Sequence, residues 1–68
     1  MTTVLKFGET VPKGRVFSYE WCVTYQFCGQ RYVAEYKTEN KGGNAWHAVL
    51  RRFKKDWNHS KILSITCD

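Results

Sequence analysis

Residues 44–57, NAWHAVLRRFKKDW, decide the fold that this sequence predicts. Apolar side chains recur there at the spacing of one helical face, which indicates an amphipathic helix over residues 44–57. This stripe consists of Trp46, Val49, Leu50, Phe53 and Trp57. Asn44 is suited to cap the start of the helix, and Asn58 is suited to end it in a left-handed conformation. A helix with one apolar side needs a second layer to cover that side, and the flanking residues supply it.

A β-hairpin is predicted before the helix, over residues 15–38. Aromatic and β-branched residues alternate with polar residues in its first half, as they do on a half-buried strand. A two-residue turn at residues 28–29 or at residues 29–30 joins the two strands, because glycine supplies the positive φ angle that such turns need. With the first of these turns, Glu20 lies opposite Lys37 on the polar side of the hairpin.

The remaining segments complete a single α+β domain over residues 1–68. Residues 61–67 alternate like a strand, and a right-handed crossover through the helix places this strand parallel to the second hairpin strand. We therefore expect a three-stranded antiparallel or mixed sheet with the first hairpin strand in the middle and the helix on one face. The other face should stay open, polar and free of aromatic rings. Residues 1–14 form an N-terminal arm that is either a short edge strand or a flap.

The positive charge of the chain is concentrated on and just after the helix. The net charge is +5, and five cations with one acid lie between residues 51 and 61. The outer side of the helix is therefore a candidate contact surface for an anionic partner. The predicted binding residues are His47, Arg51, Arg52, Lys54 and Lys55 on the helix, with Arg31 and Lys37 on the sheet. The alternative is a solvated surface whose cations interact with the helix dipole and keep the protein in solution.

Catalytic and metal-binding patterns are weak in this sequence. Glu20, Glu35 and Glu39 have no paired arrangement for acid–base chemistry, and no glycine-rich phosphate loop is present. The three cysteines, Cys22, Cys28 and Cys67, lack the close spacing of zinc ligands. We expect them to be reduced thiols that act as small packing residues. The chain is therefore predicted to be a non-enzymatic module without a cofactor or a metal ion.

The succession of elements resembles that of two groups of small proteins. The runs that carry the resemblance are Tyr32–Tyr36, Ala45–Phe53 and Ile62–Ile65, within a layout that covers about residues 16–66. This strand–strand–helix–strand layout is similar to that of small bacteriophage-encoded proteins, some of which bind and inhibit a host enzyme such as RNA polymerase. It is also similar to that of an archaeal and eukaryotic large-subunit ribosomal protein family that binds ribosomal RNA.

The resemblance implies a partner but transfers no functional residue. Its leading implication is a phage or mobile-element type of modulator that binds and inhibits a host protein or nucleoprotein machine with an acidic surface. The alternative is a nucleic-acid-binding protein whose basic helix contacts the phosphates of DNA or RNA. No signal peptide and no membrane-spanning apolar run is seen, so the expected location is the cytoplasm, that of the host if the protein is phage-encoded. The expected state is a monomer or a weak homodimer.

Overall fold

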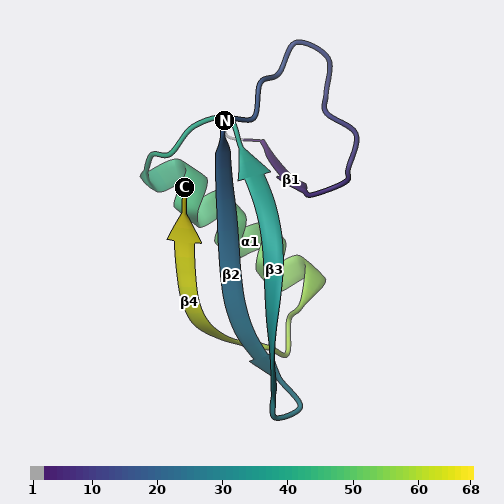
Figure 1. Cartoon of the computed structure of the whole chain (residues 1–68), viewed down its shortest axis with the longest axis vertical. Helices are drawn as coiled ribbons and strands as arrows, with labels where there is room; N and C mark the ends of the chain where they lie inside the picture. Colours follow the sequence, from purple (N-terminus) through teal and green to yellow (C-terminus); the bar gives the residue numbers. More distant parts are fainter. Residues whose placement is uncertain (1–2) are drawn as a thin grey trace.

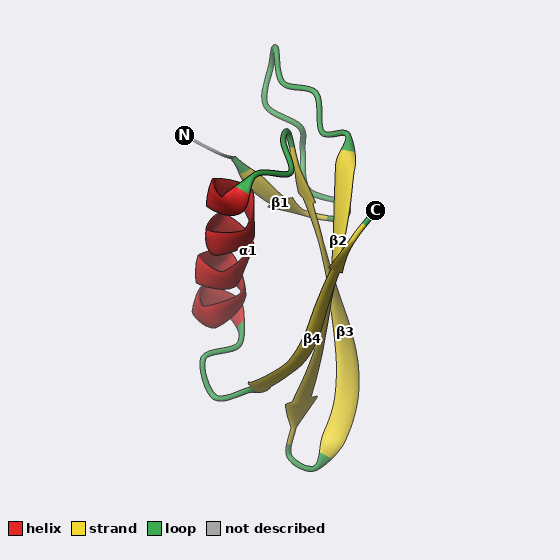
Figure 2. Cartoon of the chain, turned by 90° about the vertical axis from the view of Figure 1, so that its left-hand side faces the viewer, coloured by secondary structure: helices red, strands yellow, loops and turns green. Residues whose placement is uncertain are grey.

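A four-stranded sheet with one helix against one face makes up residues 3–68, the part of the chain that the computed structural model describes (Figures 1 and 2). The elements in chain order are β1 (Val4–Lys6), β2 (Tyr19–Phe27), β3 (Gln30–Thr38), α1 (Gly43–Asp56) and β4 (Lys61–Cys67). The strands lie in the order β1-β3-β2-β4, and all neighbours are antiparallel. The predicted α+β class is confirmed, and the fourth strand is the short edge strand that was one of the two forms expected of the N-terminal arm.

The hairpin of β2 and β3 has the first of the two predicted turns, at residues 28–29. Phe27 pairs with Gln30, so the turn consists of Cys28 and Gly29, whose φ angles are 52° and 79°. Two successive positive φ angles are typical of the turn type that matches the twist of the adjoining strands. This register places Glu20 opposite Lys37, as predicted.

β4 takes the predicted position beside β2. It pairs antiparallel to β2, which makes it parallel to β3 and puts β2 between the two. An irregularity between Thr24 and Tyr25 shifts the register, so that Thr24 lies opposite Ser64 and Tyr25 lies opposite Ile62. The N-terminal half of β4 is thereby bent relative to its C-terminal half.

The N-terminal arm contributes the short edge strand. β1 pairs with the last three residues of β3, and its central residue Leu5 is buried opposite Lys37. The chain then leaves the sheet as a loop that reaches β2 only at Tyr19 (Figure 1). The prediction that the hairpin begins at residue 15 is therefore wrong by four residues. Pairing begins where Tyr19 meets Thr38, the end of β3, and Val16 before it is 74% exposed.

α1 crosses the sheet diagonally and lies closest to β1 and β3 (Figures 1 and 2). Its buried residues are Ala45, Val49 and Phe53, which repeat every fourth position on one face. Trp46, which the apolar spacing assigned to the core, is 42% exposed. The small Ala45 side chain occupies the contact with the sheet in its place, and Trp46 is directed toward the flank of the helix.

Both predicted helix caps are wrong. The helix begins one residue earlier than expected, and Gly42 occupies the N-cap position without a capping side chain. Trp57 is the C-cap residue, with its N–H donating to the Phe53 carbonyl at 2.7 Å. Asn58 does not adopt a positive φ angle. The glycines at the start of the helix therefore carry no side chain that could accept a hydrogen bond from its first amides.

The core lies between α1 and the sheet and is largely aromatic. The Tyr25 ring meets Phe53 edge-on at 5.0 Å and stacks on Trp57 at 5.4 Å. Two polar groups of this core are paired: the Trp21 Nε1–H donates to Thr38 Oγ1 at 2.7 Å, and the Tyr36 hydroxyl donates to Asp56 Oδ2 at 3.2 Å. These bonds join β2 and α1 to the C-terminal part of β3. The buried Trp57 Nε1 has no hydrogen-bond partner in residues 3–68.

Candidate binding surface

The outer side of α1 carries a continuous set of exposed basic residues. These are His47, Arg51, Lys54 and Lys55, which we call the basic outer face. At 3.6 residues per turn they lie on the side of the helix opposite Ala45 and Val49, the residues that contact the sheet. All four residues are exposed, and their role in binding stays a prediction.

Three acidic side chains form ion pairs with cations outside the basic outer face. The ion pairs found in residues 3–68 join Lys6 to Asp56, Arg15 to Glu39, and Arg52 to both Glu9 and Asp56. The hydrogen bond from Arg15 is the main reason why the pKa of Glu39 lies below its usual value. None of these pairs includes a member of the basic outer face. Its cations are thus left to interact with solvent or with a partner.

Arg52 does not belong to the outer face, contrary to the prediction. It is half-buried on the flank of α1 that faces β1, where it contacts Glu9 of the loop after β1. Its Nε also lies 3.5 Å from Asp56 Oδ2, one helical turn later. Arg52 directly precedes Phe53 in the sequence, but its side chain lies about a quarter turn away from that of Phe53 around the helix. Arg52 therefore attaches the N-terminal loop to the helix.

The two predicted sheet residues lie on the other side of the molecule from the helix. Arg31 is exposed, and Lys37 is half-buried with its Nζ 4.8 Å from the centre of the Phe7 ring. Both alternate with the core residues of β3, so they occupy the sheet face that the helix leaves open. They are not continuous with the basic outer face. The expectation that the open face has no ring is also wrong, because the arm places Phe7 beside Lys37.

An exposed tryptophan adjoins the basic outer face. Trp46 meets the His47 ring edge-on, with 5.1 Å between ring centres, and Leu50 follows one turn later as a half-buried residue. Trp46 and Leu50 therefore lie on the flank of α1 that adjoins the basic outer face. Protein–protein interfaces commonly combine an apolar side chain with neighbouring cations, and tryptophan and arginine are enriched in them.

The three thiols are free and lie in separate places. Cys22 is on the open face of the sheet, Cys67 is on the helix side, and Cys28 is in the hairpin turn. Burial is the main cause that raises the pKa of the Cys22 and Cys67 thiols. Cys28 is exposed, so the expectation that all three thiols pack inside the fold is wrong for this one. Within residues 3–68, no three His, Cys, Asp or Glu side chains are grouped as metal ligands.

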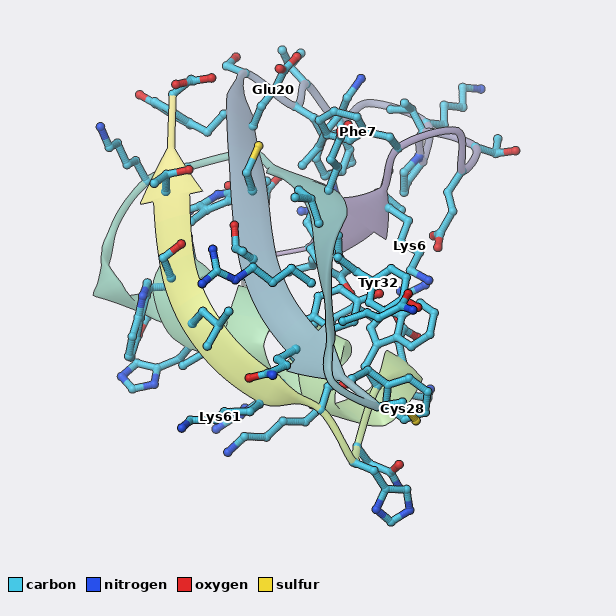
Figure 3. All side chains as sticks on the ribbon, turned by 60° about the horizontal axis from the view of Figure 1, so that its bottom comes forward. Lys6, Phe7, Glu20, Cys28, Tyr32 and Lys61 are labelled. Atoms are coloured by element: carbon cyan, nitrogen blue, oxygen red, sulfur yellow. The ribbon has the colours of Figure 1, made fainter. Side chains whose placement is uncertain are left out.

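A cavity of about 270 Å³ lies beside β3, just beyond the end of β1. Its lining residues are Lys6, Phe7, Tyr25, Val33, Ala34, Glu35 and Trp57. Figure 3 shows Phe7, Lys6, Tyr32 and Cys28 following one another along this side of the sheet toward the hairpin turn. The sequence could not identify this cavity because it gave no position for the arm, which contributes Lys6 and Phe7.

Comparisons with protein-family models, with curated proteins and with solved structures found no match for this chain. In the part of the chain that the structure describes, no helix combines the length and the apolar character needed to span a lipid bilayer.

Proposed function

We propose that this protein is a non-catalytic modulator of the phage or mobile-element type, which binds an acidic surface on a host protein or nucleoprotein machine and inhibits it. The observation that carries the proposal is the exposed Trp46 next to the basic outer face. The cations attract and orient an acidic partner, and the tryptophan supplies apolar contact area at the centre of the interface. Neither feature is required by the fold, because Ala45, Val49 and Phe53 already anchor the helix.

Nucleic-acid binding is the second candidate. It is supported by the three cations Arg51, Lys54 and Lys55, which follow one side of a helix without an acidic partner in residues 3–68. Such a row can neutralise successive phosphates. This candidate gives Trp46 a less defined role, since stacking on bases in single strands relies on several rings on an open surface.

The test is affinity purification from a bacterial lysate, with and without nuclease treatment. The proposed function predicts a specific protein that is retained after nuclease treatment, and binding that depends on Trp46 as well as on Arg51 and Lys55. The double variant Arg51→Glu with Lys55→Glu should lose the partner. The matched control is Lys13→Glu with Lys41→Glu, which makes the same change in net charge at exposed positions outside α1.

Salt dependence separates the two candidates. Binding to duplex DNA should weaken steeply with salt, with a logarithmic slope of about −0.9 for each phosphate neutralised. Binding to a protein should lose mainly association rate and should still require Trp46 at high salt. Loss of all bound material on nuclease treatment would refute the modulator proposal in favour of nucleic acid. Equal losses in the α1 variant and in the control would show that only net charge matters.

A further inference from the structure

The outer edge of β3 is only partly occupied. β1 pairs with Tyr36, Lys37 and Thr38, and the Phe7 N–H donates to the Glu35 carbonyl at 3.4 Å. β3 itself begins at Gln30, and no further strand of residues 3–68 lies on that side. About half of this edge therefore has no neighbouring strand.

The backbone groups at the unoccupied part point outward. In an antiparallel ladder, alternate residues direct both their N–H and their C=O toward the same neighbour. The hairpin turn closes on the Phe27–Gln30 pair, so Gln30, Tyr32 and Ala34 direct these groups toward β2. The N–H and C=O groups of Arg31 and Val33 consequently face away from the sheet, in the position where a further strand would receive them.

The cavity beside β3 lies at this position. Ala34, Tyr25 and Trp57 line it from the helix side, whereas Val33 and Glu35 line it from the open face. A space lined from both faces of a sheet lies in the plane of the sheet. It is therefore in line with β1 and occupies the place of the next strand.

The two walls of the cavity differ in chemistry. The helix-side wall is aromatic: Tyr25 stacks between Tyr32 and Trp57, with ring centres 5.6 and 5.4 Å away, and Lys6 Nζ lies 5.2 Å from the centre of the Trp57 ring. This wall suits an apolar side chain. The open face presents the exposed guanidinium of Arg31, which has no acidic partner in residues 3–68 and suits a carboxylate.

We propose that this edge binds an extended segment of a partner protein as an additional strand, antiparallel to β3 and in line with β1. The segment carries an apolar side chain opposite Ala34, facing the aromatic wall, and an acidic side chain opposite Arg31. Main-chain hydrogen bonds to Arg31 and Val33 hold it, and the alternating side chains give specificity. A second copy of this chain fits less well, because two molecules of net charge +5 repel each other. The site is distinct from the basic outer face and does not depend on the function proposed for it.

The test is selection of a random peptide display library on the full chain, on Val33→Pro and on Val33→Thr. Proline removes the outward N–H of Val33 and adds its ring at the edge, while pairing with β2 does not use that N–H. Threonine keeps the N–H and the branched shape. We expect selected peptides with alternating apolar and acidic residues. They should bind Val33→Pro at least about tenfold more weakly, whereas Val33→Thr should be unaffected.

Backbone methylation of the best selected peptide provides a second test that is independent of protein folding. Peptide N-methylation at the residues opposite Arg31 and Val33 should abolish binding, because their N–H groups face β3. Methylation at the intervening residues should be tolerated. The variant Arg51→Glu with Lys55→Glu should still bind the peptide.

Four outcomes would overturn the proposal. These are no enrichment over the Val33→Pro selection, equal sensitivity to methylation at every residue, loss of peptide binding in the Arg51→Glu, Lys55→Glu variant, and enrichment of the chain's own Thr3–Phe7 sequence. The third would place the peptide on α1, and the fourth would identify a second copy as the occupant. Circular dichroism establishes that each protein variant is folded, and the methylated peptides decide the question if Val33→Pro is not.

Discussion

Replacement of Phe53 by alanine tests the orientation of α1 more directly than any other single change. Phe53 is 1% exposed and lies at the centre of the helix–sheet contact, with its ring 5.0 Å from that of Tyr25. Phe53→Ala removes the buried ring and leaves a cavity, which costs about 3–5 kcal/mol in comparable cores. A chain of 68 residues is expected to have a total unfolding free energy of about 3–10 kcal/mol. The variant should therefore lose between about a third and all of this free energy.

The matched control is Trp46→Ala. The spacing of apolar residues gave Trp46 and Phe53 equal places in the core, but the structure leaves 42% of Trp46 exposed. A partly exposed ring contributes less, so Trp46→Ala should cost about 1–2 kcal/mol. Phe53→Leu, which keeps an apolar side chain of similar volume, should cost less than about 1.5 kcal/mol and should remain measurable if Phe53→Ala does not fold.

Urea denaturation followed by circular dichroism measures these free energies for the wild type and the three variants. The expected order of destabilisation is Phe53→Ala, then Trp46→Ala and Phe53→Leu together. If Trp46→Ala destabilises the protein as much as Phe53→Ala, the buried face of α1 includes Trp46. The helix would then be rotated relative to the structure described above, and the proposed role of Trp46 in binding would lose its basis.

Three further predictions follow from individual contacts. Burial, reinforced by Asp56, raises the pKa of Tyr36. The free energy of unfolding should therefore be intact below about pH 10, where an unfolded tyrosine ionises, and should fall as the pH rises beyond it. In urea titrations at several pH values, Tyr36→Phe should make this decline smaller. Thr38→Val should cost about 1–3 kcal/mol in the same assay, because the buried Trp21 Nε1–H loses its acceptor, whereas Thr38→Ser should keep it. A chelator should leave the melting temperature unchanged. Iodoacetamide should alkylate the exposed Cys28 first, as followed by mass spectrometry, because burial raises the pKa of the Cys22 and Cys67 thiols.

The order and pairing of β2, β3 and β4 could be predicted from the sequence because local signals determine them. Alternation defined the strands, and the handedness of crossovers placed β4. The glycine in the turn left two possible hairpin registers, and the structure has the one with Cys28 and Gly29 in the turn. The arm could not be placed in the same way. β1 has three residues, too few to show a periodicity, and its position depends on pairing with Thr38 more than thirty residues later.

The helix shows a different limit of sequence analysis. An apolar stripe identifies the side of the helix that is buried. However, several rotations of the helix about its axis would bury nearly the same set of apolar residues. The sequence favoured large side chains and therefore included Trp46 and omitted Ala45. The structure buries Ala45 completely, because a small residue lets α1 approach the sheet closely. The same rotation moves Arg52 away from the outer face and into ion pairs with the arm.

The distribution of ion pairs explains why the outer face of α1 is left cationic. Glu9 and Glu39 pair with Arg52 and Arg15, which are 43 and 24 residues away in sequence, so these acids tie the long loop after β1 to the rest of the fold. Each such partly exposed pair contributes only about 0–1 kcal/mol. These pairs nevertheless engage Glu9 and Glu39 with cations outside the basic outer face, so neither acid neutralises that face.

Asp56 ends α1 and pairs with Lys6 and Arg52, and the remaining three acids lie on the sheet and at its end. Glu20 and Glu35 belong to the open face, and Asp68 follows β4 beside Glu20. The helix side and the sheet side therefore differ in charge, although a chain with a net charge of +5 could have distributed its cations evenly. An acidic partner approaching from solution is attracted to the helix side first. Selection for solubility alone needs net charge but no such separation, so the separation favours a directed contact over a merely solvated surface.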